Sequence, residues 1–122
     1  MDSILNSIKK LLGITEDFTA FDEDIIMHIN SALATLTQIG VGPPNGFSIS
    51  DAYATWDEFI DDDLRFESVK SYVYLKVRLL FDPPANSVTV ESMKQMISEY
   101  EWRLNVAAES KNTADSEVNQ NG

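Results

Sequence analysis

A chain of 122 residues with 43% hydrophobic content can build one modest globular core but is too short for two independent domains. Its 20 acidic and 9 basic residues give a net charge of −11, which argues against a broad basic surface for nucleic-acid backbones. The absence of cysteine excludes disulfides, a thiol nucleophile and the usual cysteine ligands of structural zinc.

Signals for membranes and secretion are also missing from the sequence. No run reaches the roughly 18 consecutive apolar residues that a transmembrane helix needs. The N-terminus lacks the basic, apolar and small-residue order of a signal peptide, so we expect the protein to be made and kept in a cytoplasm. The acidic surface fits plain solubility, a surface past which DNA slides, or mimicry of DNA by an inhibitor.

Residues 2–12 predict a short amphipathic helix. Asp2 or Ser3 can cap its start, and Gly13 can end it in the left-handed conformation that glycine adopts easily. A helix this short is marginal alone, so we expect it to dock on its own domain or on a neighbouring molecule. Its apolar stripe consists of Ile4, Leu5, Ile8, Leu11 and Leu12.

A second amphipathic helix is predicted from an N-cap at Asp22 to about Gln38. Two glycines and a Pro-Pro pair within residues 40–44 break the helix and stiffen the chain that leaves it. Its apolar face consists of Ile25, Ile29, Leu33 and Leu36, flanked by Ile26 and Ala32.

Residues 39–62 form the least regular internal stretch. Residues 46–49 are expected to pair briefly as an extended segment. The spacing of Trp56, Phe59 and Ile60 predicts one helical turn that packs its aromatic rings on the core. Because a loop of this length is unusual in a compact domain unless it has a function, we predict a contact surface here.

The run VKSYVYLKVRLLFDPP predicts the central element of the fold, a helix over about 63–81. Its apolar residues cover most of the helix circumference, which is typical of a buried helix. The alternation over residues 73–79 also fits a strand, but the pattern extends over about 18 residues and strands rarely exceed about 10. Any acid of Asp61–Asp63 can cap the start, and Pro83 ends the helix.

Asn86 or Ser87 can cap a last helix, which is predicted from about 88 to 108. From residue 110 to 122 the chain is polar and buries too little to offset the cost of ordering, so it is predicted to be flexible when free. The apolar stripe of the helix, from which Trp102 is absent, consists of Val90, Met93, Ile97, Tyr100, Leu104 and Ala107.

Together these elements predict a mostly α fold. It is a small helical bundle of three main helices, with a short N-terminal helix, an irregular 40–62 loop and a flexible C-terminal tail. We expect a helical domain over residues 1–109 and the tail over residues 110–122.

The residue pattern predicts neither catalysis nor a cofactor. His28 is the only histidine, so a zinc site or a catalytic triad has no partners. The acids of residues 57–63 lack the spacing, glycine and final glutamate of a calcium loop. The glycines at 40 and 42 lack the Gly-Lys-Ser/Thr of a phosphate loop. We therefore expect no enzyme activity, no metal and no cofactor.

Large aromatic side chains are numerous for so small a domain. Core filling explains many of them, but tyrosine and tryptophan are also favoured at protein interfaces. The residues that we predict to lie at a protein interface are Phe47, Ile49, Trp56, Phe59, Trp102 and Arg103.

Charge is unevenly distributed along the chain. No basic residue occurs between Lys10 and Arg65, whereas the two later helices carry six of the nine. Such a chain can pair head to tail with copies of itself, and contacts of this kind close into rings when the rotation allows. Because exposed charge pairs are weak, we expect the 40–60 loop and the N-terminal helix to add apolar ring contacts.

Four segments in this order carry a resemblance: GVGPPNGFSI, a Trp-Asp-x-Phe patch, VKSYVYLKVRLLFDPP and a helix that ends EWRLN. The chain resembles, from about residue 4 to about 109, the small head–tail connector (adaptor) proteins of tailed bacteriophages and prophages, particularly those of Gram-positive hosts. None of these motifs is typical of an active site, and they identify the family only when they occur together.

The resemblance implies a structural virion protein at the head–tail neck, made in the bacterial host cytoplasm. It implies a homo-oligomeric ring, twelve copies in the particle, between the portal protein and a tail or head-completion protein. DNA would pass through the ring without specific binding, with no cofactor and no membrane. The segment after Ala108 would match the arm that engages the portal in relatives.

A different class of function is an acidic inhibitor that mimics DNA in the groove of a nucleic-acid-processing enzyme. Such a mimic needs its acids in rows at phosphate-like spacing. Here many acids stand at predicted helix starts, where capping explains them.

Overall fold

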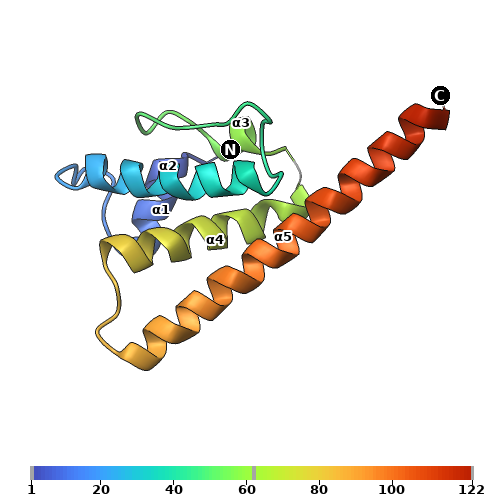
Figure 1. Ribbon diagram of the computed structural model, residues 1–122. Helices are drawn as coiled ribbons and strands as arrows, with labels where there is room; N and C mark the ends of the chain where they lie inside the picture. Colours follow the sequence, from blue (N-terminus) through green and yellow to red (C-terminus); the bar gives the residue numbers. More distant parts are fainter. Residues whose placement is uncertain (1, 62, 122) are drawn as a thin grey trace.

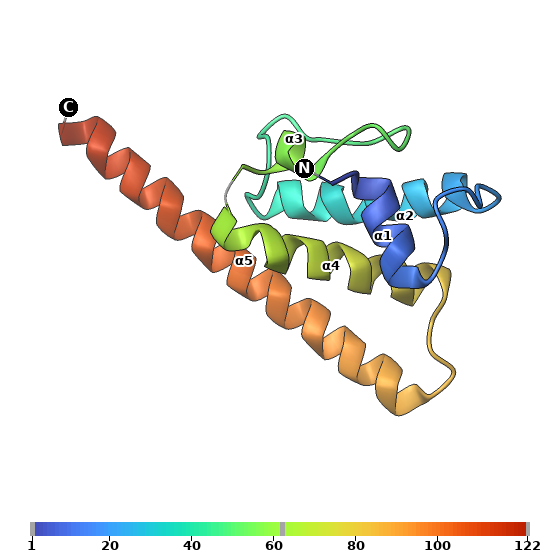
Figure 2. The ribbon, with the colours of Figure 1, turned by 180° about the vertical axis from the view of Figure 1, so that it is seen from behind.

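The computed structural model describes residues 2–61 and 63–121, and it places four helices in a packed body along which one long helix runs (Figure 1, Figure 2). The described residues contain no strand, only an isolated bridge between Ser3 and Thr55. The predicted mostly α bundle is therefore confirmed. The helices are α1 (Ile4–Leu12), α2 (Asp22–Gln38), α3 (Trp56–Phe59), α4 (Asp63–Phe81) and α5 (Ser87–Asn121).

Helix α4 is the central element, as predicted, because it packs against α1, α2 and α5. Tyr72, Val73 and Val77 in its middle are completely buried. The predicted cap among Asp61–Asp63 cannot be assigned, because Asp62 and the side chain of Asp63 lie outside the described residues.

Helix α1 docks on the core of its own chain. Ser3 caps it by accepting a hydrogen bond from the Asn6 backbone at 3.2 Å, and Gly13 ends it at φ 82°. Ile4, Leu5 and Ile8 are buried against α2 and α4. The apolar face of α1 is thus largely buried within the chain, and little of it is left exposed for a ring contact.

Helix α2 does not begin as predicted. Its N-cap is Phe21, which makes no side-chain capping hydrogen bond, and Asp22 is the first helical residue. The Asp22 carboxylate turns instead toward Lys9 on α1, and the Nζ–Oδ1 distance is 2.9 Å. Because burying an ammonium is costly unless a counter-charge is at hand, this ion pair outweighs the local capping role.

The Lys9 side chain is completely buried beneath the α1–α2 loop. Its ammonium donates hydrogen bonds to the backbone oxygens of Glu16 at 3.0 Å and Phe18 at 2.8 Å. The contact with Asp22 is an ion pair whose geometry falls short of a hydrogen bond. One cation therefore holds the loop and the first turn of α2 together.

The irregular loop is fixed by side chains rather than by a strand. The Asn30 amide donates to the Ile49 carbonyl at 2.9 Å and accepts from the Ile49 amide at 2.7 Å. This pair replaces the brief strand pairing that we expected for residues 46–49. The predicted helical turn is present as α3, and the Trp56 indole donates to the Ser7 hydroxyl at 2.7 Å.

Gly42 shows how tightly this loop packs. Its φ of 86° lies in the left-handed region, and a Cβ at this position would overlap the Phe59 ring. Only glycine satisfies both the backbone conformation and the close approach.

Helix α5 is capped as predicted by Asn86, whose Oδ1 accepts from the backbone of Val88 at 2.8 Å and Thr89 at 3.2 Å. Among its side chains that the structure describes, which extend to residue 110, the last buried one is Ala108, whereas Ala107 is exposed. Two polar bonds reinforce the contact face of α5: the Tyr72 hydroxyl donates to Glu101 at 2.7 Å, and the Asn105 amide donates to the Ile39 carbonyl at 3.3 Å.

The predicted helix end near residue 108 is wrong, because α5 continues to Asn121. Its last turns extend away from the body in both views, so the segment lies outside the core, as expected (Figure 1, Figure 2). No glycine or proline occurs between Ser87 and Asn121. The sequence therefore contains no stop signal after the last buried residue.

Replacing Lys9 by methionine should lower the free energy of unfolding by about 3 kcal/mol, because the Asp22 carboxylate and two carbonyl oxygens lose their cation. The matched control is Lys10→Met, one residue along and exposed, which should change stability by no more than about 0.5 kcal/mol. Urea unfolding of the dilute proteins measures both. Equal urea midpoints for the two variants would contradict the role of Lys9 in holding the loop and the start of α2 together.

Replacing Tyr72 by phenylalanine should cost about 1.5 kcal/mol at neutral pH, since the bond to the Glu101 carboxylate is lost. Burial, reinforced by the bond to Glu101 and its charge, raises the pKa of Tyr72 well above 10.0. The folded state then retains a proton that the unfolded chain releases, so this stabilisation is complete below pH 10.0 and declines above it. Unfolding curves across that pH should show the difference between wild type and variant shrinking; a constant difference would rule this linkage out.

Candidate functional site

The described residues offer no obvious centre for chemistry. No group of three or more His, Cys, Asp or Glu side chains in this part of the chain is arranged to hold a metal ion. His28 is half-buried on α2. None of the described helices combines the length and the apolar character needed to cross a bilayer. The features by which the described part of the chain can recognise a partner are its exposed surfaces.

The structure divides the predicted interface residues into two groups. Ile49, Trp56 and Phe59 are buried in the core, and the half-buried Phe47 ring lies against Phe59 with centroids 5.5 Å apart. These side chains support the loop from beneath, because a domain of this size needs its large apolar groups for its own core. The exposed large apolar side chain of the same loop is Tyr53.

Trp102 and Arg103 form the second group, and both are exposed on α5. Trp102 is 67% exposed and shares the face opposite the core with Val88 and Val106. Arg103 pairs with Glu99 one turn earlier. This outer face of α5 is a candidate contact surface of the kind that the sequence predicted.

An aromatic cluster that the sequence analysis missed lies where the α1–α2 loop meets the end of α4. Phe21 stands between Phe18 and Phe81, with ring centroids 5.5 Å apart in each pair. Phe18 is 49% and Phe21 43% exposed, so the cluster also faces outward. The available signal was two apolar residues inside the acidic run of residues 15–24, where core burial is not expected.

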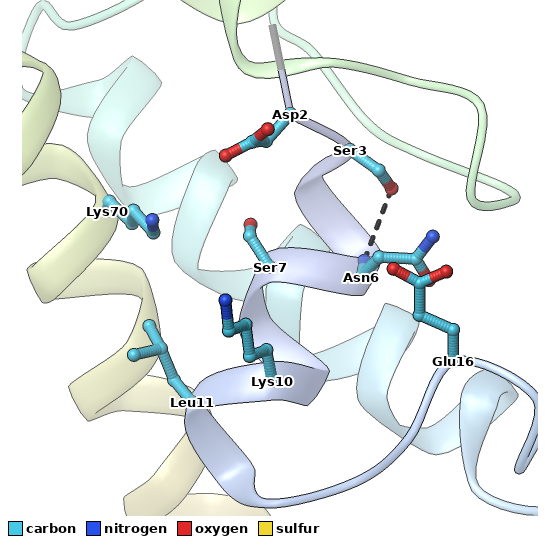
Figure 3. A pocket seen from close by; sticks show the side chains of 8 residues that line it. All are labelled: Asp2, Ser3, Asn6, Ser7, Lys10, Leu11, Glu16 and Lys70. Carbon is cyan, nitrogen blue, oxygen red and sulfur yellow. Dashed lines mark hydrogen bonds between the residues drawn. The ribbon is translucent and has the colours of Figure 1, made fainter.

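A hollow of about 570 Å³ lies between α1 and α4. Figure 3 shows Lys10 and Ser7 reaching it from α1 and Lys70 from α4, with Asp2 and Glu16 at its rim. The Ser7 hydroxyl is already engaged, since it donates to the Ile4 carbonyl at 3.0 Å and accepts from the Trp56 indole. The two lysine ammonium groups are the cations that this hollow presents.

A smaller acidic depression, about 310 Å³ in volume, lies where α3 leads into α4. Asp57, Glu58 and Asp61 line it and are exposed, and Arg65 is the one basic residue in its lining. A hydrogen bond from the Thr55 side chain lowers the pKa of the Asp57 carboxyl below its ordinary value, so this group is charged at neutral pH. We refer to the exposed surface of Asp57, Asp61 and Leu64 as the acidic corner.

Lys9 was also missed, although the pattern contained it. Position 9 follows Leu5 by one turn, so the lysine falls inside the apolar stripe of α1. A cation at such a position needs a buried partner, and the acidic start of α2 supplied an obvious one.

Comparison with known proteins gives one match. A family model described as phage connector protein matches residues 4–111. Neither the curated proteins nor the solved structures contain a match. The matched region begins at the first residue of α1 and ends three residues after Ala108, the last buried side chain of α5 among those that the structure describes. Because it includes every helix of the body and most of the chain, the protein belongs to the phage connector family, whose members are structural and act with other head and tail proteins of the phage.

Proposed function

We propose that this protein forms a ring between the portal and the tail of a phage particle, where it extends the DNA channel and gives the tail a place to attach. The observation that carries the proposal is the agreement between the family match over residues 4–111 and the packed body, whose buried residues run from Ile4 to Ala108. The whole folded unit is therefore a connector module.

The charge of the chain suits this position. At −11 the protein repels the phosphate backbone, and a channel with an acidic wall lets DNA pass without binding it. The same net charge makes copies of the protein repel one another. Ring formation then requires apolar contacts in addition to exposed ion pairs, each of which contributes about 0–1 kcal/mol.

The exposed apolar side chains indicate where ring contacts lie. The buried face of α1 and the buried residues of the 40–62 loop are committed to the core. Two pairs of neighbouring exposed apolar side chains are Trp102 and Val106 on α5 and Phe18 and Phe21 beside α4. In our proposal these surfaces, together with Arg103, meet neighbouring proteins of the neck.

The proposed division of labour follows the fold. Residues 1–109 form the connector domain of a ring of twelve copies in the particle, and residues 110–122 form an arm that reaches the portal protein. A tail or head-completion protein binds the other side of the ring. The likeness of the sequence to connectors of Gram-positive hosts extends the proposal to a phage or prophage of such a host.

The alternative function, mimicry of DNA by an inhibitor, has weaker support. The acids of Asp22–Asp24 occupy the first turn of α2, and Asp57 and Glu58 occupy the first turn of α3. These positions complement helix dipoles and account for the acids without reference to phosphate spacing.

Deleting the gene from the phage or prophage that carries it should leave heads and tails that do not join. The physical reason is that the tail loses its attachment ring. Electron microscopy of the lysate should show separate heads and tails, and a plasmid copy of the wild-type gene should restore tailed particles. Normal particles from the deletion strain would exclude the connector role.

Removing residues 110–122 should leave the body folded, because this segment is polar and has almost no apolar side chains to contribute to the core. The thermal midpoint should stay within about 2 °C of wild type. Binding to purified portal rings should weaken about tenfold or more. The control is a chain whose arm is replaced by an unrelated polar helix of equal length, which should bind as poorly as the truncated chain. Full portal binding by the truncated protein would refute the docking arm.

A further inference from the structure

Four basic side chains in the described part of the chain pair with carboxylates of their own chain. Arg78 reaches Asp82 at 4.0 Å, Lys94 reaches Glu91 at 3.5 Å, and Arg103 pairs with Glu99. Lys9 pairs with Asp22. Among the residues that the structure describes, the exceptions are Lys10, Lys70 and Lys76, which form no ion pair.

Two such exceptions meet in the hollow between α1 and α4. Within the described part of the chain, neither Lys10 nor Lys70 forms an ion pair, although Asp2 and Glu16 stand at the rim of the same hollow (Figure 3). The Lys70 ammonium lies 5.8 Å from the centroid of the Phe66 ring, a contact that leaves its hydrogen-bond donors available.

The charge around this hollow is balanced, whereas the protein as a whole carries −11. An acidic surface of a neighbouring protein is repelled less at this hollow than elsewhere on the chain. Its carboxylates can accept hydrogen bonds from the two ammonium groups. Leu11, which lines the hollow and is 44% exposed, adds an apolar contact next to the cations.

We propose that the hollow lined by Lys10, Lys70 and Leu11 receives the acidic corner of a second copy of this chain, and that this contact joins neighbouring subunits. The inference rests on the proposed ring, and it names the two surfaces that the ring brings together. In it, the carboxylates of Asp57 and Asp61 meet the lysines, and Leu64 meets Leu11.

The acidic corner is the counterpart because a ring needs two different surfaces on each subunit. The acidic residues of the α1–α2 loop are not this counterpart, because Glu16 already lines the hollow. One subunit could not bind one neighbour through the hollow and a second neighbour through this loop. The corner lies where α3 leads into α4, at the opposite end of the body from this loop (Figure 1, Figure 2). Leu64, three residues after Asp61, is 95% exposed and gives the corner an apolar group.

The first test replaces Lys10 and Lys70 together by glutamate. The control, Lys76→Glu with Lys94→Glu, makes the same change in net charge outside the hollow. Light scattering over a concentration series should show that the first variant needs about tenfold more protein to assemble, and the control no more than about threefold. Unchanged thermal midpoints in dilute solution confirm that both variants are folded.

The second test exchanges the charges between the two surfaces. A partner variant carries Asp57→Lys and Asp61→Lys and should also fail to assemble alone, because lysines then face lysines. An equimolar mixture of this variant with Lys10→Glu/Lys70→Glu restores attraction at every contact of an alternating ring, which closes when the number of subunits is even. Assembly should therefore return in the mixture and contain both variants.

Two results would overturn the inference and leave the connector function intact. One is assembly of Lys10→Glu/Lys70→Glu at the wild-type concentration, together with full restoration of tailed particles in the deletion strain. The other is a mixture of the two charge-exchanged variants that stays unassembled. Failure of the wild-type gene itself to restore tailed particles would instead count against the proposed function.

Discussion

The buried Lys9 ammonium organises the first part of this fold. It occupies a position in α1 that apolar residues surround, and it is held by two backbone oxygens of the α1–α2 loop and by Asp22 at the start of α2. Because an unpaired charge there would be very unfavourable, the loop must close over it and α2 must begin beside it. Three successive residues of α1 therefore have different roles. Lys9 holds the loop in place, whereas Lys10 and Leu11 face the hollow beside α4.

Helix α5 is held to the body in a different way. The bonds from Tyr72 to Glu101 and from Asn105 to Ile39, followed by the packing of Ala108 against Gly40, fix the helix along one face and then stop. The approach is close, since a Cβ added to Gly40 would lie only 3.1 Å from the Cβ of Ala108. The direction in which the helix leaves the body is therefore set by small residues and polar bonds.

Sequence patterns predicted those parts of the fold that depend on local physics. The long apolar run, the left-handed Gly13 and the Asn86 cap require only neighbouring residues, and each appears in the structure. The predictions that failed concern residues whose partners lie far away in the sequence. Asp22 makes no capping bond and pairs with Lys9, and Asn30 takes the place of a strand partner for Ile49. The aromatic rings of Trp56 and Phe59 pack into the core, as their spacing predicted. The exposed candidates Trp102 and Arg103 lie off the apolar stripe, whereas the lysine hollow joins α1 to α4 and has no signature in either segment alone.

The uneven distribution of charge bears on how so acidic a chain would assemble in the ring that we propose. Three of the described ion pairs lie within one helical turn and join neighbours on the same surface, so they neither link helices nor repel or attract another subunit strongly. They neutralise cations locally, and the acidic excess remains spread over the outside. At physiological salt the screening length is about 8 Å, so this excess acts mainly at close approach. In the ring that we propose, subunits meet where unpaired cations lie next to apolar groups, as in the hollow between α1 and α4. The rest of the acidic surface could then face passing DNA without holding it.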